Sequence, residues 1–218
     1  MAAFLNFLRK RNPAPETWMQ IKAREMEKFF GPVHKTARHS DVPFSADGFL
    51  DLHYYPDWGG DGSTAILTHE LINEDGSGNR NDLYDAYELV MFTRHKFDLK
   101  NAFNAQTPFG RTHRQINSIL NAVARYGAQT IFNSLETATL PSQMPEVGGH
   151  HLIFDAWQDA DGAVLELPCK GNFGIMLVMQ LLPSEMQFIE ENGTDALVNL
   201  LLENEVYPNA DLDREPVV

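Results

Sequence analysis

The chain has 218 residues, of which 43% are apolar and 22% are charged. These fractions are typical of a globular protein and exclude a disordered or fibrous chain, and the length suits one domain or two small ones. Its 17 basic and 30 acidic residues give a formal net charge of −13, which disfavours nucleic acid as a partner because phosphates would be repelled.

Cysteine content and hydropathy predict a soluble protein of the cytoplasm. Cys169 is the single cysteine, so no internal disulfide can form, and this favours a reducing compartment. No apolar stretch approaches the roughly 20 residues that span a bilayer, so no membrane partner is predicted. The basic residues 9–11 follow a short apolar run, whereas a secretory signal has its charges before that run. We expect residues 2–11 to form a helix on the domain rather than a membrane anchor.

The first half of the chain predicts one helix and three strands. The helix is expected over residues 16–30, which place their apolar side chains on one face and are followed by Gly31. A polar loop is expected from there to about Phe49. The strands are expected over residues 50–55, 64–72 and 86–94. A turn-rich segment separates the first two strands, and an acidic loop over residues 73–83 precedes the third.

A long helix and a hairpin are predicted next. Thr112 and Gln115 fit a capping box, so the helix is expected to begin at Thr112, and its apolar residues repeat at helical spacing up to Gly127. Residues 133–150 are rich in proline and glycine and are expected to form a loop. The strands of the hairpin are expected at residues 151–157 and 163–167.

The segment from Phe173 to Asn204 predicts a buried strand that leads into two acidic helices. Residues 175–182 are nearly all apolar, which indicates a strand with both faces covered. Ser184 is expected to cap the first helix and Gly193 to end it. The second helix is expected to start at Thr194 with Asp195, and a coil tail follows.

The order and lengths of these elements predict one α/β (α+β) domain, with a mixed, largely antiparallel sheet flanked by helices. We expect residues 1–48 to form an N-terminal helical extension and loop. Residues 49–205 are expected to form the core, and residues 206–218 a C-terminal tail. No internal repeat and no clear linker divides the chain.

Motifs for catalysis and cofactor binding are weak. The histidines lack the four-residue spacing of a zincin, the segment from Asn73 lacks the final glutamate of an EF-hand, and residues 59–63 lack the lysine of a phosphate loop. An alternative hypothesis is a metal-dependent hydrolase that uses His69, Glu70 and Glu88. His69 and Glu70 are adjacent on a predicted strand, so their side chains should point to opposite faces. We therefore predict no catalytic residue, no metal and no cofactor.

Acidic residues are concentrated in two regions. Residues 51–88 and residues 184–215 each contain nine acids and one base. Such regions favour a basic protein partner, because opposite charges accelerate association. Trp58 either anchors such an interface or packs on the edge of the sheet. The residues expected to bind a partner lie on the loops 57–61 and 73–85, and they are Asp57, Trp58, Asp61, Glu74, Asp75, Asp82 and Asp85.

Four segments resemble the Suppressor of Fused domain family, and in family order. Residues 87–92 resemble its E-L-[VT]-[MF] strand, and residues 119–130 resemble its helix that ends in L-A-R-Y. Residues 173–201 resemble the strand and two helices that close the domain, and residues 211–214 resemble the final D-x-x-R. One position departs from the family pattern T-x-G-[LM]-S, since Glu70 stands where the family commonly has glycine.

The resemblance implies a single bacterial-type domain, with the fold of the family's N-terminal domain, that binds protein and has no known chemistry. In animals the family is a two-domain repressor that clamps a transcription-factor peptide, and this role is not expected of the first domain alone. Bacterial single-domain relatives include immunity proteins that neutralise toxins. We therefore expect a non-enzymatic binding module, an immunity or regulatory protein whose partner is a basic toxin or regulatory protein.

Overall fold

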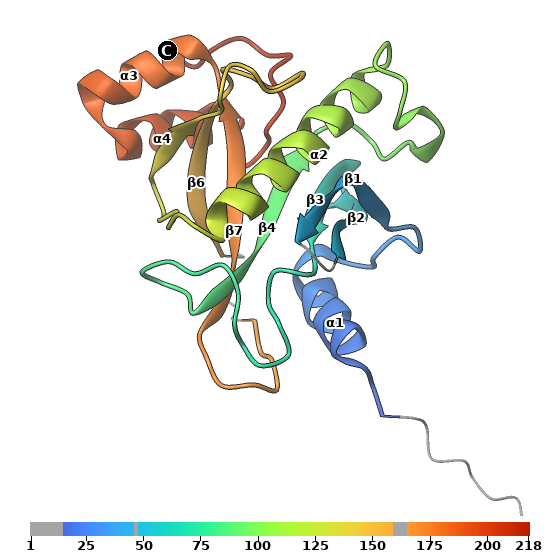
Figure 1. The fold of residues 1–218 in the computed structure, drawn as a ribbon. Helices are drawn as coiled ribbons and strands as arrows, with labels where there is room; N and C mark the ends of the chain where they lie inside the picture. The colour runs from blue at the N-terminus through green and yellow to red at the C-terminus, as the bar shows by residue number, and fades with distance from the viewer. Residues whose placement is uncertain (1–14, 46–47, 159–164) are drawn as a thin grey trace, which may run out of the picture.

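Seven strands form one mixed sheet with helices on both of its faces (Figure 1). The computed structural model describes residues 15–45, 48–158 and 165–218, so the helix expected over residues 2–11 lies outside the described residues. The strands are β1 Arg38–Ser45, β2 Gly48–Trp58, β3 Ser63–Thr68, β4 Ala86–Thr93, β5 Thr137–Thr139, β6 His151–Trp157 and β7 Phe173–Leu181. The helices are α1 Trp18–Phe30, α2 Pro108–Gly127, α3 Pro183–Asn192 and α4 Thr194–Glu203, with a 3₁₀ turn η1 at Leu99–Asn101.

The strand order is β1-β2-β3-β4-β7-β6-β5. β4 and β7 are parallel neighbours, with Glu88 opposite Ile175, and every other pairing is antiparallel. The mixed, largely antiparallel sheet expected from the sequence is therefore confirmed. Parallel neighbours need a long crossover, and here the chain between β4 and β7 contains α2, β5 and β6.

The hydrophobic core is divided into two clusters by the sheet. One lies between the sheet and α2, where Ile116, Ile119 and Leu120 pack. The other lies on the opposite face and includes Met26 of α1 and Leu197 of α4. β7 supplies alternate side chains to each cluster, and all nine of its residues are buried. This confirms the prediction of a strand covered on both faces.

Three predicted element boundaries are wrong in the first half of the chain. β1 forms where a polar loop was expected before Phe49, because its backbone pairs with β2. β3 ends at Thr68 rather than at residue 72, since the N–H groups of Leu71 and Ile72 donate to the Glu88 carboxylate instead of to a neighbouring strand. α2 starts at Pro108 rather than at Thr112, because Thr107 caps the helix and proline suits the first helical position.

Three further predictions in the second half of the chain need correction. β5 forms within residues 133–150, where a loop was expected, because its backbone pairs with β6. Residues 165–167 are not a strand, and β6 pairs instead with β5 and β7, which satisfies both of its edges. Ser184 does not cap α3. The helix begins at Pro183, and the Glu185 carboxylate accepts a hydrogen bond from the Leu182 N–H. Gly193 ends α3 as expected. Within the described residues, no helix is long and apolar enough to cross a bilayer.

Candidate functional site: acidic loops and a carboxylate–histidine cluster

The turn between β2 and β3 carries two of the predicted partner-binding acids. Asp57 and Asp61 are exposed, and Asp57 has a left-handed backbone with a φ of 60°. Oδ1 of Asp57 accepts a hydrogen bond from the Gly62 N–H at 2.9 Å, and Oδ1 of Asp61 accepts one from the Ser63 N–H at 2.8 Å. Hydrogen bonds from Ser63 lower the pKa of the Asp61 carboxyl. Both carboxylates therefore contribute to the shape of the turn as well as to its charge.

Trp58 packs against the core beside this turn. Its ring centroid lies 4.3 Å from that of Phe92 and 5.7 Å from that of Trp157. The side chain is half-buried among the hydrophobic residues on the α1 and α4 face of the sheet. The geometry corresponds to a tryptophan packed on the sheet, and only the remaining exposed part of the ring is accessible to a partner.

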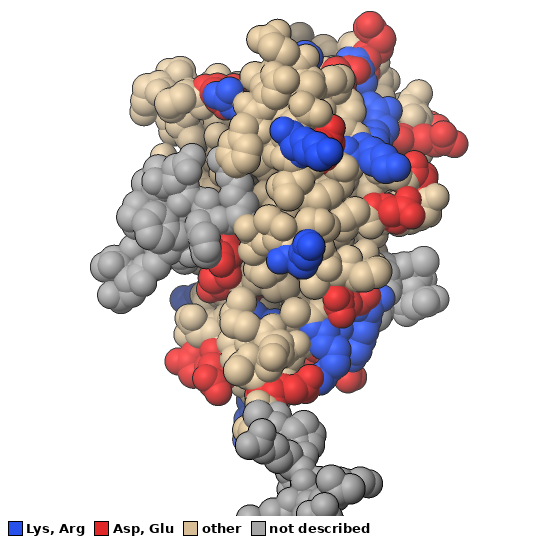
Figure 2. Space-filling model, turned by 90° about the vertical axis from the view of Figure 1, so that its right-hand side faces the viewer, with Lys and Arg blue, Asp and Glu red and all other residues tan. Residues whose placement is uncertain are grey.

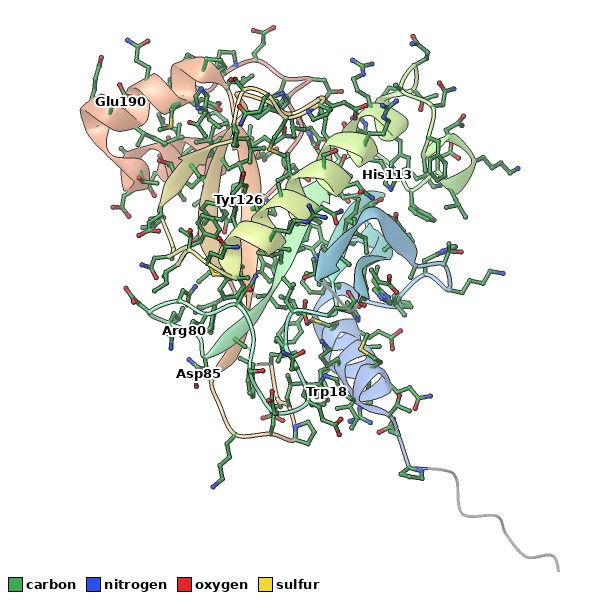
Figure 3. The ribbon with its side chains drawn as sticks, viewed as in Figure 1. Trp18, Arg80, Asp85, His113, Tyr126 and Glu190 are labelled. Atoms are coloured by element: carbon green, nitrogen blue, oxygen red, sulfur yellow. The ribbon has the colours of Figure 1, made fainter. Side chains whose placement is uncertain are left out.

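The loop between β3 and β4 carries the other four predicted acids, Glu74, Asp75, Asp82 and Asp85, all of them exposed. This loop is held by hydrogen bonds to distant segments. The Asp85 N–H donates to the Asn172 carbonyl, and the Asn172 N–H donates to Oδ2 of Asp85, each at 2.8 Å. Asn79 Nδ2 donates to the Ala124 carbonyl at the end of α2. Figure 3 shows Arg80 and Asp85 on these loops, below the end of α2.

The two acidic loops lie at opposite ends of the sheet. Residues 57–62 precede the first residue of β3, and residues 69–85 follow its last residue. β3 is six residues long, so at about 3.3 Å per residue the two loops are roughly 20 Å apart. Asp57, Trp58 and Asp61 therefore do not share one surface with Glu74, Asp75, Asp82 and Asp85.

The second acidic region divides into structural and exposed carboxylates. Glu185 and Asp211 are buried. Seven acids of this region are exposed. Five of them lie between residues 183 and 205, where there is no lysine or arginine, and these are Glu190, Glu191, Asp195, Glu203 and Glu205. Glu190 lies at the outer side of α3 (Figure 3). By contrast, the face in Figure 2 has lysine and arginine side chains interspersed with acidic ones.

Glu88 is a structural residue rather than a base or a metal ligand. It is fully buried and accepts hydrogen bonds from Lys22 Nζ at 2.8 Å and from Thr68 Oγ1 at 2.7 Å. The N–H groups of Leu71 and Ile72 donate to the same carboxylate at 3.0–3.2 Å. Both oxygens of Glu88 are thus occupied by donors from the protein.

The His69 side chain does not form a site together with Glu88 either. The His69 side chain is fully buried, and its Nε2 lies 2.8 Å from the Tyr55 hydroxyl. Burial and the nearby charges of His53 and Lys22 hold the pKa of His69 well below its ordinary value, so the imidazole is neutral. The set His69, Glu70 and Glu88 is not among the groupings of the described residues whose ligand atoms converge.

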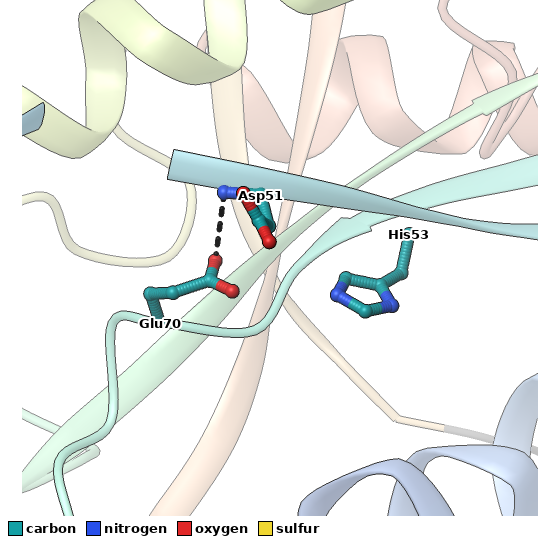
Figure 4. Close-up of side chains that lie close together, drawn as sticks. All are labelled: Asp51, His53 and Glu70. Atoms are coloured by element: carbon teal, nitrogen blue, oxygen red, sulfur yellow. Dashed lines mark hydrogen bonds between the residues drawn. The ribbon is translucent and has the colours of Figure 1, made fainter. Parts of the chain in front are cut away.

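A different grouping converges around Glu70. One ligand atom each from Asp51, His53 and Glu70 lies within 4.8 Å of the others (Figure 4). Oε2 of Glu70 accepts hydrogen bonds from the Asp51 N–H at 3.0 Å and the His69 N–H at 3.3 Å. Burial, followed by the Glu88 and Asp51 carboxylates, raises the pKa of Glu70 to about 8.

Sequence reasoning missed Asp51 and His53. The available signal was their spacing, because residues i and i+2 of a strand share one face. The register of β2 with β3, in which Leu52 is opposite Thr68, then brings residue 70 beside them. A second grouping within the described residues joins His95, Asp211 and Asp213 at the start of the C-terminal tail.

Comparison with known proteins identifies the family. Two solved structures share the fold: a chain of the Sufu–Fu complex (TM-score 0.59, 11% identity, covering 94% of this chain and 93% of that one), and a SUFU homologue from Neisseria gonorrhoeae FA 1090 (TM-score 0.54, 13% identity, covering 92% and 97%). No curated protein is significantly similar in sequence. A sequence model described as "Suppressor of fused protein (SUFU)" matches residues 67–215, and the chain therefore belongs to this family.

Proposed function

We propose that this domain is a non-enzymatic protein-binding module, an immunity or regulatory protein that binds a basic partner through its acidic loop over residues 73–85. Family membership supports a role in protein interaction, since a structure with the same fold is that of the Sufu–Fu complex. A basic toxin or a basic regulatory protein has the charge that such a loop would bind.

The observation that carries the proposal is an acidic loop that is both exposed and held in place. Four exposed carboxylates lie within twelve residues, from Glu74 to Asp85, and Arg80 is the only base among them. The hydrogen bonds from Asn79 to Ala124 and between Asp85 and Asn172 hold the loop on the domain. A loop that is already ordered loses little conformational freedom on binding, so more of its electrostatic attraction contributes to affinity.

Asp57, Trp58 and Asp61 enter the proposal as a secondary contact. Because they lie at the other end of β3, a partner would have to extend along the sheet to meet both loops. The proposal therefore centres on residues 73–85, and loss of Asp57 and Asp61 is expected to weaken binding less than loss of the four other carboxylates.

The test compares two variants with the same change in charge. The loop variant carries Glu74→Gln, Asp75→Asn, Asp82→Asn and Asp85→Asn, and amides are chosen because they keep an oxygen that accepts the hydrogen bonds of Asp75 and Asp85. The control carries Glu190→Gln, Glu191→Gln, Asp195→Asn and Glu203→Gln on α3 and α4. Each changes the net charge from −13 to −9, by removing four negative charges.

The partner is first captured from the source cells with the unaltered domain, and its association rate is then measured at low and high salt. The loop variant should slow association at low salt by about tenfold or more, and the control should slow it far less. Equal slowing by the two variants would show an effect of net charge alone. Unchanged binding by the loop variant would refute the proposed surface.

A further inference from the structure

We propose that Asp51, His53 and Glu70 form a binding site for a first-row divalent metal ion such as Zn²⁺. This inference is independent of the proposed partner surface, because the site is formed by β2 and the segment after β3 rather than by the acidic loop over residues 73–85.

The backbone brings these three side chains together by two separate means. Asp51 and His53 are two residues apart on β2 and therefore lie on the same face of the sheet. Glu70 follows β3, the neighbouring strand, and Oε2 of its carboxylate is fixed by the N–H groups of Asp51 and His69. The ligand atoms lie within 4.8 Å of one another, whereas ligands of a tetrahedral zinc ion are about 3.3 Å apart. Binding of an ion would therefore draw the three ligand atoms closer together by rotation of their side chains.

The ring of His53 is held in place before any ion binds. It stacks on His69 with centroids 3.9 Å apart and an interplanar angle of 16°. His69 is itself fixed by burial and by the Tyr55 hydroxyl at 2.8 Å. A second layer of contacts that orients a histidine ligand is a common property of metal sites.

The electrostatic environment favours a cation. Glu88 is paired with the ammonium of Lys22, but the Glu70 carboxyl lies close to the carboxylates of both Glu88 and Asp51. A divalent cation between the Asp51 and Glu70 carboxylates would attract both and relieve the repulsion between them.

The donor set also selects the kind of metal. One imidazole and two carboxylates suit Zn²⁺ or another first-row divalent ion, whereas Ca²⁺ and Mg²⁺ prefer oxygen ligands alone. Three protein ligands leave at least one coordination position for water or for a side chain of another molecule. Glu70 stands in this cluster, and this gives a chemical role to the residue that departs from the family pattern.

The experiment uses the full chain, stripped of metal with a chelator and dialysed. Isothermal titration with ZnCl₂ should show one site per chain, and ZnCl₂ should raise the melting temperature, because an ion that binds only the folded state stabilises it. His53→Gln and Asp51→Asn, made separately, should each weaken Zn²⁺ binding by at least about tenfold while far-UV circular dichroism stays unchanged. Two variants so chosen keep the test valid if one of them fails to fold.

Two matched controls address other zinc ligands. His95→Gln alters the second grouping of the described residues, with Asp211 and Asp213, and Cys169→Ser removes the single thiol. Neither should change the affinity. Absence of binding by the unaltered chain, or binding that is insensitive to both His53→Gln and Asp51→Asn, would overturn the proposal. Loss of binding in His95→Gln alone would overturn it too, by placing the ion at the tail.

Discussion

Lys22 of α1 and Glu88 of β4 form a buried ion pair, with Nζ 2.8 Å from Oε1 and both side chains at most 1% exposed. The same ammonium donates to the carbonyls of His69 and Ile72, and the carboxylate accepts from the N–H groups of Leu71 and Ile72. One ion pair thus connects the first helix, the end of β3 and the centre of the sheet. It also explains why the backbone after Thr68 leaves the sheet without losing its hydrogen bonds.

Replacing Lys22 should therefore destabilise the domain strongly. Lys22→Met leaves Glu88 charged, buried and without its cation, and this is expected to cost about 3–5 kcal/mol in the free energy of unfolding. Adding Glu88→Gln removes the uncompensated charge, so the double variant should be more stable than Lys22→Met alone. Urea denaturation of the single and double variants measures this coupling. If the double variant loses as much unfolding free energy as Lys22→Met and Glu88→Gln lose together, the two residues do not act as a unit.

Gly174 should not tolerate a methyl group. A Cβ at this position of β7 would lie 2.2 Å from the ring of Tyr84, so Gly174→Ala must displace a buried aromatic side chain. Overpacking of this kind costs about 1–3 kcal/mol. The loss should shrink when Gly174→Ala is made in a Tyr84→Leu background, where the smaller side chain leaves room. An equal loss of stability in both backgrounds would show that the clash with the Tyr84 ring is not its cause.

The elements that the sequence predicts well are those with strong local signals. β7 follows from a nearly continuous apolar run, and the boundary between α3 and α4 follows from Gly193, and each signal acts within a few residues. β1 has no such signal in its own sequence, because its extended backbone is stabilised by hydrogen bonds to β2. The start of α2 has two competing signals. Thr107 with Pro108 is the true start, while the capping-box match at Thr112 falls inside the helix, where Thr112 is buried.

The candidate sites are harder to predict, because composition does not reveal which acids are exposed or adjacent. Glu185 and Asp211 add to the acidic count of residues 184–215, yet both are buried and bonded within the domain. Asp57 and Glu74 belong to one acidic region of the sequence but lie at opposite ends of β3. Conversely, His53 and Glu70 are 17 residues apart in the sequence and meet only through the register of β2 with β3.

Tyr87 should make the domain sensitive to alkaline pH. Its hydroxyl is buried without a hydrogen-bond partner among the described residues, and burial raises its pKa to about 12 from an ordinary value of 10.0. Between these values the unfolded chain releases the phenolic proton and the folded chain retains it, so stability falls as the pH rises from 10 to 12. Tyr87→Phe should be neutral or slightly stabilising at pH 7, because no hydrogen bond is lost.

The comparison of Tyr87→Phe with the unaltered chain isolates this group, since the other tyrosines titrate in both. The variant should become relatively more stable by about 1.4 kcal/mol between pH 9 and pH 11, at 1.36 kcal/mol per pKa unit. Urea denaturation at pH 9, 10 and 11 measures the difference. A constant difference at all three values would show that Tyr87 ionises as readily in the folded state as in the unfolded one.

Arg214 should hold the end of the C-terminal tail on α3. Its guanidinium forms a bidentate pair with Glu185, with N–O distances of 2.5 and 2.8 Å, and Oε1 of Glu185 also accepts from the Val217 N–H. Arg214→Lys keeps the charge but loses the bidentate geometry, so the tail should open more often. Hydrogen exchange should accelerate at least about tenfold at Val217, while the Ala210 N–H, which donates to the Phe92 carbonyl at 2.8 Å, should retain its protection. Equal acceleration at both amides would mean that the variant loosens the whole domain, and no acceleration at Val217 would mean that another contact holds the tail.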